Sequence, residues 1–317
     1  MIRLVVRRLG FGVLTLWAVS LIVFLATQAL PGDAAQAILG REATPERLAA
    51  LRAQLHVGDP LITQYLQWLR GIVTLDPGNS LANGLPVGEF LGPRIVNSLV
   101  LMLCAAAIST PIAMLIGTWT ALRRDRLADH ATALATLVLA ALPEFVVGIL
   151  LVIGFATGLL HVLPAVFVAG GSGPAWADPV QLVLPTLTLV LAVGPYIVRM
   201  MRATMVEVLE SEYVQQARLK GLPERAVLLR HALPNALGPV VQVIALQLAW
   251  LAGGVVVVEF LFRYPGVGFA LIDAVSNRDL PVVQVLSLLI AGVYIVVNLV
   301  ADLISLATNP KVRTAPV

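Results

Sequence analysis

Long apolar runs separated by short charged segments dominate the chain. Six runs contain no Asp, Glu, Lys or Arg: 9–32, 95–122, 145–177, 179–198, 231–258 and 280–301. A helix needs about 20 residues to cross a bilayer core of about 30 Å, and in lipid only helices and closed barrels satisfy every backbone polar group. Each run is long enough for one such helix. The pattern therefore predicts an all-α membrane protein with six transmembrane helices.

Two of the runs need further interpretation. The run 145–177 is interrupted by Leu163-Pro164 and then by a glycine-rich turn signal, so it has room for one helix, which we expect to start near Ala131 and to end near Leu160. The first run follows two arginines and could be a signal peptide, but its 24 residues exceed the ~7–15 of a signal-peptide apolar region. We interpret it as a retained helix.

Composition and charge support this class and add an orientation. The chain is 59% hydrophobic and only 12% charged, with a mean hydropathy of +0.91. If the N-terminus is cytoplasmic, 14 of the 21 Lys and Arg residues fall on that side. Long translocated segments contribute little to the positive-inside rule. The bias therefore predicts that both termini are cytoplasmic and that the segment 31–94 is outside.

The outside segment 31–94 carries signals for local structure. Thr44-Pro45 and Asp59-Pro60 each resemble an N-cap followed by proline at the first helical position. Three leucines then share one helical face: Leu48, Leu51 and Leu55. We expect two short amphipathic helices here, with a solvated loop as the alternative. A further short helix, too short to span, is expected at Phe269–Val275.

The most polar stretch between two predicted spans follows the fourth run. Apolar residues at helical spacing from Met205 to Lys220 predict one helix, whose apolar positions are Val208, Leu209, Tyr213 and Ala217. Gly221 suits the helix-terminating position, where a positive φ is cheap only for glycine. Pro223 suits the first turn of a second helix, which Pro234 closes. The segment therefore predicts a helical hairpin with a glycine turn.

The charge of this hairpin favours a protein partner over a membrane surface. Helices that lie on a membrane surface gather Lys and Arg on their polar face. Here Glu207, Glu210 and Glu212 dominate the first half. We therefore expect the hairpin to project into the cytoplasm and to dock with a soluble protein.

The sequence offers no catalytic or metal-binding pattern. The single cysteine, Cys104, permits no intrachain disulfide and no cysteine-based metal site, and the four histidines lie in separate segments. There is no HExxH and no GxxxxGK[ST] loop. We predict no catalytic residue, no metal site and no cofactor in this chain, so that any ATP is hydrolysed by another polypeptide.

At the hairpin the chain resembles a known family, the membrane subunits of ABC importers in the branch that handles dipeptides, oligopeptides and nickel. The family's loop has Glu-Ala-Ala, three residues, Gly, nine residues and Ile-x-Leu-Pro. Here Gln215-Gln216-Ala217, Gly221 and His231-Ala232-Leu233-Pro234 keep that spacing. Gln215, Gln216 and His231 depart from the pattern, but the branch's own variant is present as YVQQARLKGL, from Tyr213 to Leu222.

Other strings resemble the same branch over nearly the whole chain. They include the N-terminal RRLGFGVLTLWAVSLIVFLATQALPGD, then DPLITQYLQWLRGI, ALPEFVVGILL, VVVEFLFRYPGVG, NRDLPVVQ and NLVADLISLATNPKVR. The resemblance implies the type I importer permease fold with a cytoplasmic coupling hairpin. It divides the chain into a helix at 1–30, an extracytoplasmic segment at 31–94, a core at 95–306 with a coupling loop at about 203–234, and a tail at 307–317.

The resemblance also implies a function and partners. The chain would be a multi-pass inner-membrane permease subunit that works with a second, homologous permease, two cytoplasmic ATPase subunits that bind ATP and Mg²⁺, and an external substrate-binding protein. A short peptide is the expected substrate, with nickel, glutathione or oligosaccharide as alternatives. The residues expected to couple to the ATPase are Glu212, Tyr213, Ala217, Arg218, Lys220, Gly221, Leu222 and Pro234.

Two carboxylates are candidates for the translocation pathway. Glu144 lies about 14 residues into the expected third span, about 20 Å along it, where a charge is costly unless it faces protein or water. It either lines the pathway or is a buried structural carboxylate. Glu259 is the second candidate. An ion-coupled secondary transporter is the alternative class, but it would need more charges inside the membrane and no inverted repeat is visible.

Overall fold

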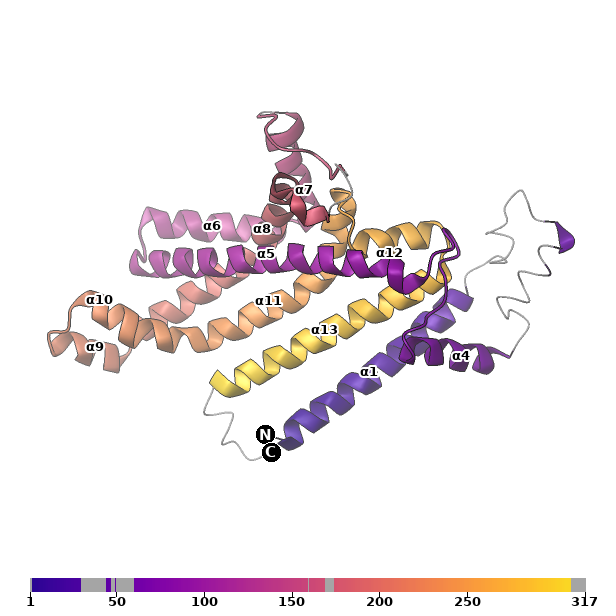
Figure 1. Ribbon diagram of the computed structural model, residues 1–317. Helices are drawn as coiled ribbons and strands as arrows, with labels where there is room; N and C mark the ends of the chain where they lie inside the picture. The colour runs from indigo at the N-terminus through magenta and orange to yellow at the C-terminus, as the bar shows by residue number, and fades with distance from the viewer. Residues whose placement is uncertain are drawn as a thin grey trace. The chain divides into compact units, whose positions relative to one another are not determined.

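The computed structural model describes residues 2–29, 44–46, 49, 60–158, 160–168 and 174–308 (Figure 1). These residues are almost entirely helical. Five helices are long and apolar enough to cross a membrane, or six if the bent pair Leu127–Ala141 and Glu144–Thr157 counts as one span. This confirms the all-α membrane class. The chain divides into two compact units, one formed by 2–98 and 265–293 and the other by 99–264 and 294–317.

The first unit contains α1 (Ile2–Gln28), α4 (Leu61–Val73), α12 (Val267–Ser276) and the first parts of α5 (Val87–Leu122) and α13 (Leu280–Thr308). Helix α4 packs on α1 through three aromatic side chains, Phe24, Tyr65 and Trp68. The hydroxyls of Ser20 and Tyr65 share a hydrogen bond of 2.8 Å.

The structure tests part of what was expected outside the membrane. Helix α4 confirms the second short helix of the segment 31–94, but Pro60 is its N-cap and not its first helical residue as expected. Helix α12 confirms the short helix expected at Phe269–Val275. The first helix of the segment rested on Leu48, Leu51 and Leu55, and these lie outside the described residues, as does Asp59.

A buried carboxylate organises the loop between α4 and α5. Asp279 is 3% exposed. It accepts hydrogen bonds from the hydroxyl of Ser80 and from the backbone N–H of Leu81 at 3.0 Å. A buried carboxylate is tolerated when several donors satisfy it. Asp279 thus fastens this loop to the start of α13.

The second unit is built around α8 (Pro179–Leu209) and α11 (Leu233–Leu261), which pack against each other along much of their length. It also contains α6 (Leu127–Ala141), α7 (Glu144–Val152), the π-helical turn η2 (Ile153–Thr157) and the short turn η3 (Ala175–Ala177). Three shorter elements follow α8 and precede α11 in the sequence: α9 (Glu212–Leu219), α10 (Glu224–Ala226) and η4 (Val227–Ala232). One buried cluster includes Leu101, Leu184, Leu189, Leu251 and Val258.

A glycine sets the approach of α5 to α8. A Cβ at Gly117 would lie 2.7 Å from the Cβ of Met201 and 2.7 Å from the carbonyl oxygen of Val198. Cβ atoms do not approach backbone so closely, because atoms at that distance repel. The two helices can therefore pack this tightly only where the side chain is absent.

The expected third span is not one helix. The helix begins at Leu127 rather than near Ala131 and ends at Ala141, and α7 leaves it at 106° (Figure 1). Pro143 explains the break, because a proline excludes the preceding residue from the helical region. Leu142 is accordingly extended, with φ −86° and ψ 132°. The prediction of a continuous helix from Ala131 to Leu160 was wrong.

Candidate functional site

We call residues 203–234 the coupling segment. It contains the end of α8, then α9 (Glu212–Leu219), α10 (Glu224–Ala226) and the π-helical turn η4 (Val227–Ala232). Figure 1 shows α9 and α10 as a hairpin beyond the ends of α8 and α11. The expected hairpin is present, but its first arm differs from the prediction.

The first arm is two helices instead of one. Helix α8 ends at Leu209, and Ser211 is extended with φ −67° and ψ 147°. The hydroxyl of Ser211 donates to the carbonyl oxygen of Val208 at 2.5 Å, and the N–H of Ser211 donates to the same oxygen at 3.1 Å, so Ser211 closes the end of α8. Serine is favoured at such junctions because its side chain competes for local backbone bonds. The expected single helix from Met205 to Lys220 was therefore wrong.

The break at Ser211 also changes which face of α9 is buried. Val214 and Ala217 pack on Val227 of the second arm, and Val208 and Leu209 of α8 lie against them. Tyr213, expected on the apolar face, is 44% exposed. The irregular residues between α8 and α9 shift the phase of the helical repeat, so a spacing of four from Leu209 no longer points to the same side.

The turn at Gly221 is the feature that the sequence predicted best. Gly221 has φ +77°. Its N–H donates to the carbonyl oxygen of Arg218 at 2.9 Å, and the N–H of Leu222 donates to that of Ala217 at 3.4 Å. These two bonds form a Schellman motif, the common way to end a helix at a left-handed residue. A Cβ at Gly221 would meet no atom within 4 Å, so glycine is required here by backbone conformation and not by space.

An ion pair crosses the same turn. The guanidinium of Arg218 donates to both carboxylate oxygens of Glu224, at 2.6 and 3.2 Å. These hydrogen bonds raise the pKa of Arg218. Both side chains are largely exposed, so the pair adds less to stability than the backbone bonds do, but its two-pronged geometry fixes the angle between the arms.

The second arm does not end at Pro234. The helical path continues from Glu224 to Leu261, with the π-helical turn η4 just before Pro234. Proline cannot donate to the carbonyl four residues earlier and its ring crowds that carbonyl. The wider turn accommodates this defect and keeps the arm continuous with α11. Pro234 thus lies inside a bent helix, and the prediction that it closes the helix was wrong.

The predicted coupling residues divide into two groups. One group, exposed on the hairpin, comprises Glu212, Tyr213, Arg218, Lys220, Gly221, Leu222 and Pro234. Ala217 is 6% exposed and packs inside the hairpin. Leu219, which was not singled out from the sequence, is 87% exposed. Exposed apolar side chains such as Leu219 and Tyr213 suit a contact with another protein, although single exposed leucines are common.

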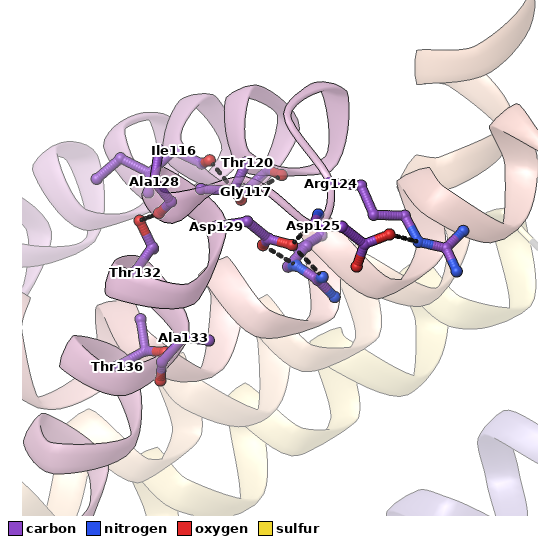
Figure 2. A network of polar contacts seen from close by, with 11 residues as sticks. Ile116, Gly117, Thr120, Arg124, Asp125, Ala128, Asp129, Thr132, Ala133 and Thr136 are labelled. Carbon is purple, nitrogen blue, oxygen red and sulfur yellow. Dashed lines mark hydrogen bonds and ion pairs between the residues drawn. The ribbon is translucent and has the colours of Figure 1, made fainter.

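The loop between α5 and α6 and the start of α6 are fastened to α8 and its C-terminal end by two ion pairs that the sequence did not reveal. Asp129 is 1% exposed, and its oxygens accept hydrogen bonds from Nε and Nη2 of Arg202 at 2.5 and 2.6 Å. The N–H of Asp125 donates to the same carboxylate at 3.1 Å (Figure 2). Arg124 pairs with Glu210, at the end of α8. The two pairs connect the start of α6 and the loop before it to the helix that leads into the coupling segment.

Glu144 lies at the bend, in the first turn of α7, and not in the middle of a span. It is half-buried and lines a cavity of about 470 Å³, which we call the bend pocket. The other lining residues are Leu139, Ala140, Ala141, Leu142, Pro143, Ala192, Tyr196, Gln247 and Trp250. Glu259 is completely buried near the end of α11 and does not line this pocket.

Within the described residues, no cluster of three or more His, Cys, Asp or Glu side chains could hold a metal ion. Two features of the described residues stand out: the helical hairpin of the coupling segment and the pocket at the helix bend. Together with five or six helices able to span a bilayer, they belong to an all-α membrane protein with a polar hairpin that projects beyond its helices.

Comparison with known proteins gives the family. Residues 113–314 match the family described as "Binding-protein-dependent transport system inner membrane component", and residues 1–83 match the N-terminal part of the same kind of component. The chain belongs to this family. It is therefore a permease subunit in a transport system of the inner membrane, and it works with ABC-transporter partners such as a substrate-binding protein and an ATPase.

Relatives of the same length carry more specific names. The "Probable peptide ABC transporter permease protein y4tP" of Sinorhizobium fredii is 33% identical over 311 residues, which cover 98% of both chains. The "Glutathione transport system permease protein GsiC" of Escherichia coli K12 is 36% identical over 313 residues, 99% of both chains. The protein of that name from Salmonella typhi is equally similar.

Proposed function

We propose that this chain is one of two homologous permeases in an ATP-driven importer of short peptides. Two ATPase subunits would bind ATP and Mg²⁺, and an external binding protein would deliver the peptide. The names of the relatives support a peptide or the tripeptide-sized glutathione over nickel or oligosaccharide. The orientation that puts both termini and the coupling segment in the cytoplasm is part of this proposal.

The observation that carries the proposal is the construction of the coupling segment. An ATPase that closes on ATP can move membrane helices only through a rigid contact with them. Here the turn is held by the two Schellman bonds at Gly221, by the pair Arg218–Glu224 and by the buried contact of Val214 with Val227. The hairpin is thus tied to α8 on one side and is continuous with α11 on the other.

Reconstitution tests the proposal. The chain would be co-expressed with its partner permease, ATPases and binding protein, purified and placed in liposomes. We expect ATP-dependent uptake of a radiolabelled tripeptide that needs the binding protein. Labelled glutathione and nickel in parallel reactions discriminate among the substrates. Uptake driven by a proton or sodium gradient without ATP would instead establish the ion-coupled class, and purification without any ATPase would overturn the assembly.

A further inference from the structure

The bend pocket is built by four elements and has the size of a ligand site. Its walls are the end of α6, the start of α7, one side of α8 and one side of α11. The volume of about 470 Å³ falls in the range of about 300–1,000 Å³ that small-molecule sites occupy. The pocket exists because Pro143 breaks the helix, so that the two halves diverge by 106°.

The polar groups of the pocket favour a cation. Glu144 is the one carboxylate among the described lining residues, and neither lysine nor arginine is among them. Within the part of the chain that the structure describes, the carboxylate of Glu144 makes no hydrogen bond or ion pair. A carboxylate that is withdrawn from water for structural reasons is normally paired. An unpaired one beside a cavity is available to a ligand.

Two aromatic rings and an amide complete the lining. Trp250 and Tyr196 are 41% and 38% exposed, and aromatic faces attract ammonium groups. The Tyr196 hydroxyl makes a long contact of 3.5 Å with the carbonyl of Ala140, and Arg199 lies on its ring at 5.4 Å. Gln247 adds an amide oxygen that can accept a hydrogen bond.

The position of Trp250 is fixed by a neighbouring glycine. A Cβ at Gly254, one helical turn further along α11, would lie 2.8 Å from Cζ3 and 2.9 Å from Cη2 of the indole. The ring therefore lies flat over Gly254. A larger side chain there would push the indole away from its present place in the pocket lining.

We propose that the bend pocket binds the ammonium group of a peptide during its passage through the membrane. The carboxylate of Glu144 would pair with this group, and Trp250 and Gln247 would surround it. The same chemistry could come from the α-amino group, which is mostly charged near neutral pH, or from a lysine side chain. The identity of the cargo rests on the proposed function, but the preference of the pocket for an ammonium ion does not.

A labelling experiment tests the pocket without any substrate. The single native thiol is removed by Cys104→Ser, and Ala141→Cys places a thiol in the lining. The purified complex is then treated with 2-aminoethyl methanethiosulfonate, which carries an ammonium group, and with its sulfonatoethyl counterpart. We expect the ratio of the two rates to fall roughly tenfold when Glu144→Gln is added, which corresponds to about 1.4 kcal/mol. Glu144→Asp should keep most of the ratio.

The matched control is Glu89→Gln. Glu89 also lies in the first turn of a helix, α5, and is exposed, but it does not line the pocket. The ratio should not change in this variant. An unchanged ratio in Glu144→Gln would overturn the proposal. So would a failure of both reagents to reach the thiol in the resting complex and in the complex trapped with ATP and vanadate.

Uptake then identifies the source of the ammonium group. For each of three peptides, the rate in Glu144→Gln is divided by the wild-type rate, so that the preference of the binding protein cancels. A loss for trialanine but not for N-acetyl-trialanine indicates the α-amino group. A loss for an acetylated peptide that contains lysine indicates the side chain. Equal losses for all peptides contradict the proposal, whereas absence of wild-type uptake of any peptide contradicts the proposed function alone.

Discussion

The coupling segment and the bend pocket each lie at a break between helices. The two breaks differ in whether the charged side chains beside them are paired. At Gly221 the freed backbone groups are satisfied by two internal bonds, and the charges of Arg218 and Glu224 neutralise each other. At Pro143 the chain turns by a similar interruption, but the carboxylate of Glu144 is left beside a cavity. Under the two proposals, the break whose charges are paired acts as a lever, and the break that leaves a carboxylate beside a cavity acts as a binding site.

The two breaks are physically connected through one unit. Helix α6 ends at the bend pocket, and in its first turn Asp129 is bonded to Arg202 of α8. Helix α8 in turn leads into the coupling segment. Movement of the hairpin can therefore reach the bend along two packed helices, α8 and α6. The ion pair Asp129–Arg202 is therefore the first contact on this path to disrupt by mutation.

Asp129→Ala should have the largest effect on stability. It leaves Arg202, which is two-thirds buried, without its partner, and the loss of one member of such a pair costs about 3 kcal/mol. The apparent melting temperature of the purified complex in detergent should fall by several degrees. Arg124→Ala is the matched control, because it breaks an exposed pair with Glu210 that is worth less than about 1 kcal/mol. Equal effects of the two variants would show that the Asp129 pair is not a fastening point.

Gly221→Val should uncouple substrate uptake from ATP hydrolysis without affecting the bend pocket. A β-branched residue at φ +77° costs about 1–2 kcal/mol, so the turn should open and α9 should fray. We expect uptake per ATP hydrolysed to fall about fivefold to tenfold in the assembled complex. The assay measures uptake and ATP turnover together in liposomes.

Gly221→Asn separates conformation from bulk. Asparagine tolerates the left-handed region, and the space around Gly221 is open, so this variant should retain most of the coupling. If Gly221→Val transports normally, the hairpin has no part in coupling. If Asn and Val are equally damaging, the positive φ is not the cause.

The sequence predicted elements better than the connections between them. The apolar runs predicted the spans because hydrophobicity alone sets where a chain can cross lipid. Gly221 was predictable because only one residue type fits its conformation cheaply. The pair Asp129–Arg202 could not be predicted, since 73 residues separate its members and nothing local marks the contact.

The missed helix breaks are a different case, because their signals were present. Leu142-Pro143 is a helix-ending dipeptide, and Ser211 before Glu212 resembles a helix start. Both signals lay inside long helical patterns, which outweighed them. The structure follows the local signal in each case. In a membrane helix a proline is tolerated when neighbouring groups satisfy the backbone, and at Pro143 the break lies beside a pocket.

Gly254→Ala should weaken the pocket without altering its charge. The new Cβ displaces the indole of Trp250, so the pocket keeps Glu144 but loses one aromatic face, which is worth about 0.5–1 kcal/mol to a cation. The labelling ratio should fall about threefold. Gly253→Ala is the matched control, because a Cβ at Gly253 would meet no atom within 4 Å. A larger loss in Gly253→Ala than in Gly254→Ala would show that the indole does not contribute.

Arg218→Ala should have the smallest effect on uptake per ATP. The size of this effect measures how much the pair Arg218–Glu224 contributes to the stability of the hairpin. The pair Arg218–Glu224 is two-pronged but largely exposed, so its removal should cost only about 0.5 kcal/mol. The Schellman bonds and the buried contact of Val214 with Val227 remain, and uptake per ATP should fall by less than about twofold. The same liposome assay serves, first at low salt and then at 0.5 M salt, where screening should remove the difference from wild type.

If uptake per ATP fell as far in Arg218→Ala as in Gly221→Val, the ion pair would contribute as much as the glycine turn, contrary to this prediction. Alternatively, Arg218 would act directly on the ATPase rather than on the turn. Glu224→Gln distinguishes the two, since it breaks the same pair from the other side and leaves the guanidinium in place. If the ion pair only supports the turn, both variants should be mild and equal. If Arg218 contacts the partner, Arg218→Ala alone should be severe, and the rigidity of the hairpin would then depend on the complex and not on the chain itself.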